Sequence, residues 1–357
     1  MRSFLSEKHA ALVPYTPGEQ PQNMEYVKLN TNESPFPPTP AVVEAAAREA
    51  GRLNLYCDPT CRILCEKAAQ LYGVRPENIL PVNGSDEILY FAFMAFCDEE
   101  HPAAFPDISY GFYPVYADIH HVPAHVIPLT EDFRIDPKAY CGLSETIVIA
   151  NPNAPTGICL SVSEIEEIVR TNPDNVVLID EAYIDFGGES CVSLIEKYDN
   201  LLVTQTFSKS RSLAGGRLGF GIGSEGLIRD LNTIKYSTNP YNINRMTQAC
   251  GIAAIEDNDV YMANCRVIAE NREYTAAELQ KLSFTVLPSK ANYVFAKSPD
   301  ISGDDYYQTL KARGVLVRHF TAERIRDYVR ISIGTKEQMD VLLEKTREIL
   351  KERGAAR

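Results

Sequence analysis

The chain has 357 residues, of which 45% are hydrophobic and 23% charged, so it is long enough for two globular domains with a large core. Its formal charge of −13 argues against nucleic acid or an anionic membrane as a partner, although local arginines still allow a small anionic substrate. Its 9 cysteines do not indicate a disulfide scaffold, and without a recognisable signal peptide or membrane-spanning run we expect a cytoplasmic protein.

The N-terminal third is predicted to be irregular at first and then helical. Residues 1–35 are rich in Pro, Asn and Glu, whereas "PAVVEAAAREAG" predicts a helix that ends at Gly51 and "SDEILYFAFMAFC" (85–97) predicts a buried helix. Between them, Cys57, Cys61 and Cys65 are spaced to share one helix face. No CxxC pair or nearby His supports a metal site, so we interpret them as small, half-buried apolar residues.

The middle of the chain gives the strongest fold signal. "TIVIA" (146–150), "VVLID" (176–180) and "LLVTQ" (201–205) are short apolar runs rich in β-branched residues, typical of parallel strands covered on both faces. Between the first two runs, "SVSEIEEIVR" has helical spacing and a capping box from Ser161 to Glu164. This pattern predicts an α/β domain over residues 36–255, with a mostly parallel central sheet flanked by helices.

Beyond residue 256 the pattern changes to that of an α+β unit. A long helix (258–282) precedes short strands at "ANYVFAK", "GVLVRHF" and "YVRISIG", and a closing helix begins with a capping box from Thr335 to Gln338. We therefore expect a second, smaller C-terminal domain over 256–357, together with the N-terminal arm 1–35.

Each of the three central strands runs into distinctive polar residues. Asn153 lies in "NPNAPTG" after the first strand, Asp180 ends the second, and Lys209 follows the third. Each alone is explained equally well by a turn or a helix cap. Ligands of open α/β sheets bind beyond the carboxyl ends of the strands, so an amide, a carboxylate and an amine are expected to meet in one crevice.

Together these groups match the needs of pyridoxal 5'-phosphate. Lys209 would form the Schiff base with its aldehyde, and a buried Asp180 would keep the pyridine nitrogen protonated. Asn153 and Tyr183 would contact the ring hydroxyl. Hydroxyls, a cation and a helix N-terminus would hold the phosphate; these are supplied by Thr206, Ser208, Arg217, Gly84, Ser85 and Asp86. The glycines of "GRLGFGIG" lack the GxGxxG spacing, and "SLAGGR" has no Walker lysine, so neither predicts a nucleotide loop.

At this point the residues resemble a known family. "NPNAPTG", "DEAY", the Ser208-Lys209 pair and Arg217 are similar to the motifs of the fold-type-I pyridoxal-phosphate aminotransferases. Within that fold, the resemblance is strongest to the histidinol-phosphate aminotransferases, through "PYTPG", "VKLNTNESPFPP", "YCDP", "NGSDEIL", "SYGFYPVYA" and "VRISIGT". It covers nearly the whole chain. It implies transfer of an amino group from L-histidinol phosphate to 2-oxoglutarate in histidine biosynthesis, by a homodimer with shared active sites.

The resemblance also implies roles for six further residues. Tyr110 would stack on the pyridine ring, Tyr56 would reach the cofactor phosphate of the partner subunit, and Arg330 would bind the substrate anion. Three further residues are implied in the substrate pocket, namely Arg318, Tyr15 and Asn32. Cys57 stands where the family usually has proline after the bridging tyrosine.

Other functions remain open on the sequence alone. An aromatic amino-acid aminotransferase or a threonine-phosphate decarboxylase would share the fold and the cofactor. A non-catalytic, cofactor-binding regulator is disfavoured, because Lys209 is retained and no basic helix-turn-helix segment precedes residue 39. No metal site is predicted.

Overall fold

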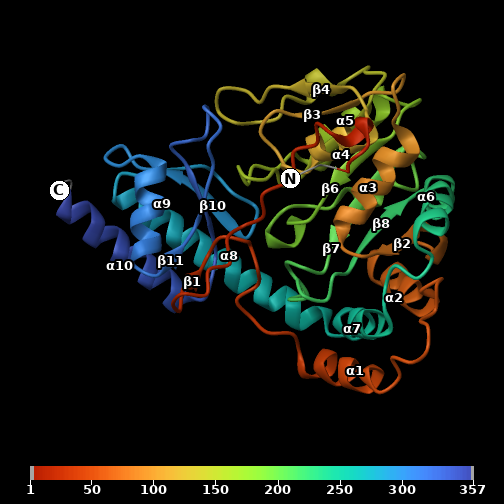
Figure 1. The fold of residues 1–357 in the computed structure, drawn as a ribbon, viewed down its shortest axis with the longest axis horizontal. Helices are drawn as coiled ribbons and strands as arrows, with labels where there is room; N and C mark the ends of the chain where they lie inside the picture. Colours follow the sequence, from red (N-terminus) through yellow and green to blue (C-terminus); the bar gives the residue numbers. More distant parts are fainter. Residues whose placement is uncertain (1–3, 355–357) are drawn as a thin grey trace.

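The computed structural model describes residues 4–354 and contains two larger sheets, of seven and four strands, and a third of only two strands (Figure 1). The larger sheet has seven strands in the order β2-β8-β7-β6-β5-β3-β4. In that order the strands are Ile79–Val82, Gly219–Gly223, Leu201–Thr206, Val177–Asp180, Thr146–Ala150, Ala103–Pro106 and Ala124–Ile127. Only β8 pairs antiparallel with its neighbours, which confirms the mostly parallel sheet and the three predicted central strands.

Helices cover both faces of this sheet. One face packs against α3 (Ser85–Phe96), α4 (Tyr113–His120) and α6 (Glu225–Thr238), and the other against α2 (Arg62–Tyr72), α5 (Val162–Thr171) and α7 (Arg245–Glu256). The side chains of β5 alternate between the two cores: Ile147 and Ile149 enter one, and Val148 enters the other. This explains why the strands read as continuous apolar runs.

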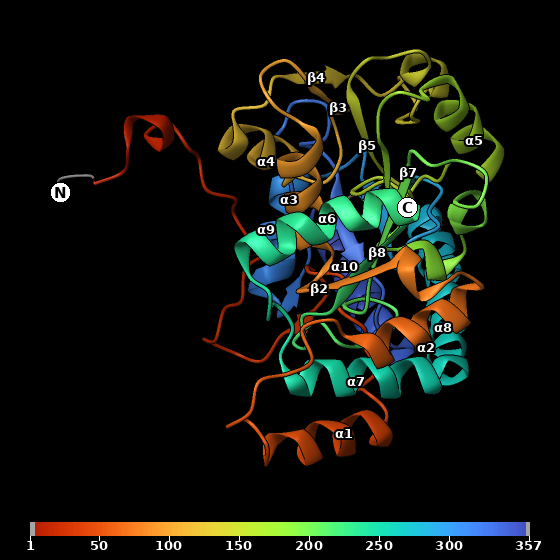
Figure 2. The same ribbon diagram turned by 90° about the vertical axis from the view of Figure 1, so that its right-hand side faces the viewer.

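The predicted helix signals are confirmed at their ends. The helix α1 (Pro40–Ala50) ends at Gly51 and lies beside α7 (Figure 1 and Figure 2). The capping box from Ser161 to Glu164 starts α5. The expectation of one helix face for the three cysteines is wrong: α2 begins only at Arg62, so Cys61 is its N-cap and Cys57 precedes it. Cys61 has a left-handed φ of 50°, and this turn breaks the expected period.

The smaller sheet is antiparallel, in the order β12-β13-β10-β9. Its strands are Arg318–His319, Val329–Ser332, Tyr293–Lys297 and Thr285–Val286. It packs with the long helix α8 (Asn258–Lys281), with α9 (Gly303–Ala312) and with α10 (Lys336–Glu352), which starts at the predicted capping box. The sequence predicts the order helix, antiparallel strands, helix, and the structure adds α9 between β10 and β12, which was not predicted. The division at residues 255 and 256 stays a prediction.

The N-terminal arm joins the smaller sheet's side of the molecule. Its strand β1 (Val27–Lys28) pairs in parallel with β11 (Val315–Leu316). Short 3-10 turns complete the element set at Glu7–His9, Pro76–Asn78, Pro137–Tyr140, Ile184–Phe186 and Cys191–Leu194. No helix within residues 4–354 is both long and apolar enough to cross a membrane. The arm thus brings residues 27–34 toward the carboxyl ends of the central strands.

Candidate active site

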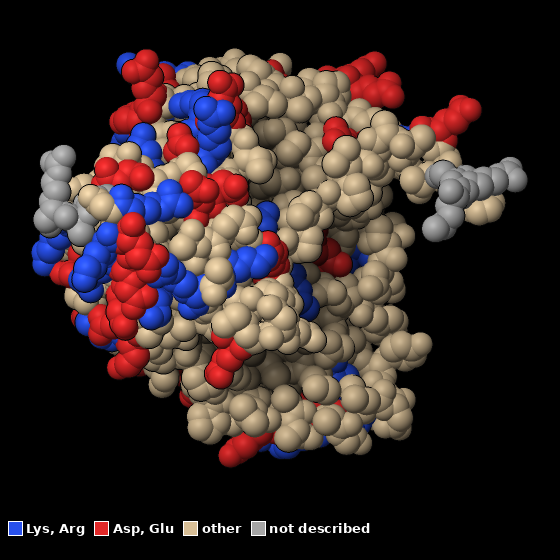
Figure 3. Space-filling model, turned by 60° about the vertical axis from the view of Figure 1, so that its left-hand side comes forward, with Lys and Arg blue, Asp and Glu red and all other residues tan. Residues whose placement is uncertain are grey.

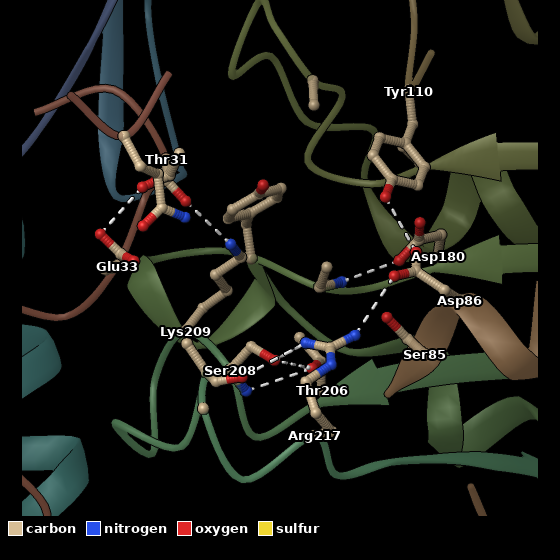
Figure 4. Close-up of a pocket in the computed structure, with 17 residues that line it drawn as sticks. Thr31, Glu33, Ser85, Asp86, Tyr110, Asp180, Thr206, Ser208, Lys209 and Arg217 are labelled. Carbon is tan, nitrogen blue, oxygen red and sulfur yellow. Dashed lines mark hydrogen bonds and ion pairs between the residues drawn. The ribbon is translucent and has the colours of Figure 1, made fainter. Parts of the chain in front are cut away.

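A cavity of about 380 Å³ opens at the carboxyl ends of β5, β6 and β7. In the close-up, labelled side chains from the ends of β6 and β7, the start of α3 and the N-terminal arm surround it (Figure 4). Of the residues predicted to hold a cofactor, those that line it are Ser85, Asp86, Tyr110, Asp180, Tyr183, Thr206, Ser208, Lys209 and Arg217. The structure therefore brings together side chains that are up to 132 positions apart in the sequence, from Ser85 to Arg217.

Asp180 is the buried acid of this cavity. It is the last residue of β6 and only 5% exposed. Its carboxylate accepts hydrogen bonds from the Ala182 backbone N–H at 3.1 Å and from the Tyr113 hydroxyl at 3.2 Å. Burial nevertheless dominates and raises the pKa of Asp180 to about 7. A carboxylate that is costly to ionise alone is suited to pair with a cationic group inside the cavity.

Lys209 supplies the amine. Its Nζ donates to the Thr31 backbone carbonyl at 3.1 Å (Figure 4) and lies 5.9 Å from the centre of the Tyr183 ring. Neither contact is an ion pair, although the acidic Glu33 lines the same cavity. Thr31 was not identified from the sequence, because a backbone carbonyl leaves no side-chain signal.

One end of the cavity is built to hold an anion. The N–H groups of the first turn of α3 begin at Ser85, and the positive end of the helix dipole lies there. Thr206 and Ser208 hydrogen-bond to each other through their hydroxyls at 3.0 Å, and the Arg217 guanidinium lies 3.5 Å from the Ser208 Oγ. Arg217 also lies 3.5 Å from the Asp86 carboxylate.

Gly84 and Gly219 allow this close packing. Gly84 has a φ of 78°, and a methyl group added there would lie 2.6 Å from Arg217 Nη2. A methyl group at Gly219, on the antiparallel strand β8, would lie 2.4 Å from the Ser85 backbone nitrogen. The absence of a side chain at Gly84 and Gly219 is therefore the reason that the start of α3 can approach Arg217 and the sheet.

Tyr110 lines the cavity, whereas Asn153 does not. The Tyr110 hydroxyl donates to Asp86 at 2.8 Å, and burial, with Asp86 beside it, raises the pKa of this phenol. Asn153 is 1% exposed, and its amide donates to the Ile108 carbonyl and to the Thr156 hydroxyl. It does not line the cavity, so its predicted contact with a ring hydroxyl stays a prediction.

A second cavity, of about 320 Å³, adjoins the first. The two share five lining residues, namely Thr31, Tyr110, Ala154, Tyr183 and Lys209. All four residues predicted for the substrate line the second cavity, namely Tyr15, Asn32, Arg318 and Arg330. In the space-filling view, basic side chains lie inside the hollow between the two parts of the molecule (Figure 3).

Arg330 is the half-buried cation of the second cavity. Its guanidinium donates to the Asn30 carbonyl at 3.2 Å and lies over the Tyr293 ring at 5.3 Å. Its buried Nε has no hydrogen-bond partner within residues 4–354. Arg318, in contrast, donates to the backbone carbonyls of Thr16 and Pro17 and so holds the arm.

Tyr56 lies outside both cavities. It is 80% exposed and stacks on Tyr241, with the ring centres 4.6 Å apart. An exposed tyrosine beside other exposed apolar side chains, such as Leu53 and Leu55, is compatible with the predicted contact to a partner subunit.

The residues of the first cavity fit pyridoxal 5'-phosphate by their chemistry. An amine, a buried acid and a helix-start anion site stand around one space, and Arg330 lines the adjoining space. Tyr113, which donates to Asp180, was missed in the sequence because tyrosines are frequent in the stretch 110–116 and nothing distinguishes it there.

Comparison with known proteins gives a consistent result. The family model described as aminotransferase class I and II matches residues 24–345. The histidinol-phosphate aminotransferase of Brachyspira hyodysenteriae is 49% identical over 98% of this chain and 100% of that protein, and the one of Syntrophus aciditrophicus is 48% identical over 97% and 98%. The crystal structure of histidinol-phosphate aminotransferase from Sinorhizobium meliloti, in complex with pyridoxal-5'-phosphate, has the same fold, with a TM-score of 0.83 at 23% identity over 92% of each chain. The chain belongs to the class I and II aminotransferase family.

Proposed function

We propose that this chain is a pyridoxal-phosphate-dependent aminotransferase that moves an amino group between L-histidinol phosphate and 2-oxoglutarate. The products are imidazole-acetol phosphate and glutamate, and the reaction belongs to histidine biosynthesis. The observation that carries the proposal is the position of Lys209, which lines both the cavity with Asp180 and the adjoining cavity with Arg330. Full-length relatives at 44–49% identity that carry this name support the substrate.

Bound pyridoxal phosphate supplies an electron-accepting ring that stabilises negative charge at the substrate α-carbon. The residues of this chain do the remaining work. Asp180 holds a positive charge at the ring nitrogen, and burial strengthens that pairing. Lys209 Nζ would leave the Thr31 carbonyl and take the proton from the substrate α-carbon as a general base. It would then deliver that proton to the cofactor as a general acid.

Arg330 has two different anions to bind in turn. Histidinol phosphate has no α-carboxylate, so its phosphate takes the place that a carboxylate of glutamate occupies in the second half-reaction. A planar guanidinium can donate two parallel hydrogen bonds to either group. Arg318 lies on the same cavity and adds a second positive charge for the phosphate, while it holds the arm at Thr16 and Pro17.

The proposal includes a homodimer in which Tyr56 completes the partner's phosphate site. The exposure of Tyr56 and its absence from the lining of the two cavities support this arrangement. It also includes a large domain over 36–255 and a small domain over 256–357 with the arm. A cytoplasmic location is supported by nine cysteines that are all free thiols.

Steady-state rates test the proposed substrate. The purified enzyme with 2-oxoglutarate should turn over L-histidinol phosphate with a higher kcat/KM than phenylalanine, and it should release no carbon dioxide from threonine phosphate. The Lys209→Ala variant should lose at least about 100-fold in kcat, because it lacks the proton carrier. The matched control is Lys197→Ala, which removes an exposed lysine paired with Glu166 and should keep wild-type rates. Absence of turnover with histidinol phosphate would contradict the substrate assignment.

A further inference from the structure

The arm segment 29–32 is held by its own backbone between the small sheet and the cavity. Each of its four successive carbonyls accepts one hydrogen bond from a distant residue. In order, the donors are Ser332 N at 2.9 Å, Arg330 Nη2 at 3.2 Å, Lys209 Nζ at 3.1 Å and Asn292 Nδ2 at 2.9 Å. Asn32, the last residue of the segment, has a left-handed φ of 57° and is 1% exposed. The backbone position from which the Asn32 side chain extends is therefore fixed.

From Asn32, a directed chain of hydrogen bonds leads to the cavity. The Asn32 backbone N–H donates to the Ser332 Oγ at 2.8 Å, and the Ser332 hydroxyl donates to Asn32 Oδ1 at 2.7 Å. The Asn32 Nδ2 then donates to the Tyr183 hydroxyl oxygen at 3.0 Å. Asn32 and Ser332 are both buried, so water does not replace the two bonds between them.

Ser332 determines which way the Asn32 amide points. A serine hydroxyl has a single proton, and here Asn32 Oδ1 is its acceptor. If the amide turned over, that proton would be buried without an acceptor, which is unfavourable. The amide NH2 group is consequently kept toward Tyr183.

The orientation of the amide decides what Tyr183 offers to the cavity. Because the Tyr183 oxygen accepts from Asn32, its own proton is left to point elsewhere, and within residues 4–354 it donates to no protein acceptor. Tyr183 lines both cavities, and its ring packs edge-on against Tyr293, with the centres 5.1 Å apart. The ring is thus fixed and the hydroxyl proton is directed to a ligand.

We infer that Ser332 is a positioning residue that acts through Asn32 to keep Tyr183 a hydrogen-bond donor toward the phenolic oxygen of the bound cofactor. This inference rests on the proposed function and deepens it. It gives the Asn32 amide a role within the protein, since both ends of that amide are already used. Ser332 lies two residues after Arg330 on β13, so the strand that carries the anion-binding arginine also orients the cofactor contact.

Titration of the full-length apo-protein with pyridoxal phosphate, followed by visible absorbance, tests the inference without any amino donor. Loss of one hydrogen bond should weaken cofactor affinity about three- to tenfold in Ser332→Ala and similarly in Tyr183→Phe. The double variant should bind no more weakly than Tyr183→Phe alone, because both changes remove the same contact. The matched control is Thr346→Val, which deletes a buried hydroxyl bonded to Tyr306 in the small-sheet core and should leave the affinity unchanged.

A second variant reverses the chain and nearly preserves its shape. In Asn32→Asp the carboxylate accepts from Tyr183, which turns the Tyr183 proton away from the cavity. Introducing Asn32→Asp into the wild-type protein should therefore reduce cofactor affinity by a larger factor than introducing it into Tyr183→Phe. In the Tyr183→Phe background only the added charge acts.

Four outcomes would count against these ideas, and they are distinguishable. Wild-type affinity in a folded Ser332→Ala protein overturns the inference, as do losses that add in the double variant. If Ser332→Ala does not fold, an equal effect of Asn32→Asp with and without the Tyr183 hydroxyl overturns it. A wild-type protein that binds no pyridoxal phosphate overturns the proposed function itself.

Discussion

The substitution Asp180→Asn should make the apo-protein more stable and the enzyme inactive. Asp180 is buried at the end of β6, and burial raises its pKa from 3.8 to about 7 in the folded state. Between pH 3.8 and about 7, the folded state therefore keeps the Asp180 proton, which the unfolded state has already lost. Stability from this group is fully present below pH 3.8 and is lost as pH rises through about 7. Asparagine has the same shape and no charge to bury.

The size of the effect follows from the gap between the two pKa values. Each pH unit corresponds to about 1.4 kcal/mol, so the roughly three units between 3.8 and about 7 amount to ~4 kcal/mol at most. At pH 5, which is about one pH unit above the unfolded-state pKa, the loss of stability caused by Asp180 is only about 1.5 kcal/mol. The stability difference between Asp180→Asn and wild type should therefore grow by about 2.5 kcal/mol from pH 5 to pH 8. Any pH-independent cost of the substitution cancels in this comparison.

Urea unfolding of both apo-proteins at several pH values measures this difference. The chain contains no tryptophan, so circular dichroism is the suitable signal. A stability difference that is the same at pH 5 and pH 8 would refute the reasoning, because it would mean that the Asp180 carboxylate is not destabilised by burial. With saturating pyridoxal phosphate the order should reverse, since the ring nitrogen then pairs with the wild-type carboxylate.

Three further predictions concern the rest of the site. Gly84→Ala should weaken cofactor binding at least about tenfold, whereas Gly142→Ala should not. Both glycines have a left-handed φ. An added methyl group would lie 2.6 Å from a guanidinium nitrogen at Gly84, but it would meet nothing within 4 Å at Gly142. Equal loss in both would show that only backbone strain matters. Arg330→Ala should raise KM for histidinol phosphate and for 2-oxoglutarate by about tenfold or more in steady-state assays; a change for one substrate alone would argue against a shared anion site. Mixed and re-annealed Tyr56→Ala and Lys209→Ala subunits should regain activity that neither parent has, and failure would contradict shared active sites.

Much of the fold follows from the sequence because local signals and burial agree. The apolar runs of β5, β6 and β7 are long enough to exclude a surface position, and the capping boxes at Ser161 and Thr335 mark helix starts at the positions observed. The prediction for Cys57, Cys61 and Cys65 is wrong because spacing alone does not reveal the left-handed turn at Cys61. A period of four describes a face only if the helix has already begun.

The site was predictable where side-chain chemistry carries it and unpredictable where the backbone does. Asp180 and Lys209 follow strands whose order the sequence suggests, so their meeting could be expected from parallel topology. The Thr31 carbonyl and the Ser332 hydroxyl have no such signal, since they act through contacts that span 178 and 300 residues. Asn32 shows the difference most clearly: its residue type indicated a ligand contact, while its partners in the fold make it a link between Ser332 and Tyr183. A polar residue near a cavity can therefore be assigned a role only after its own hydrogen bonds are known.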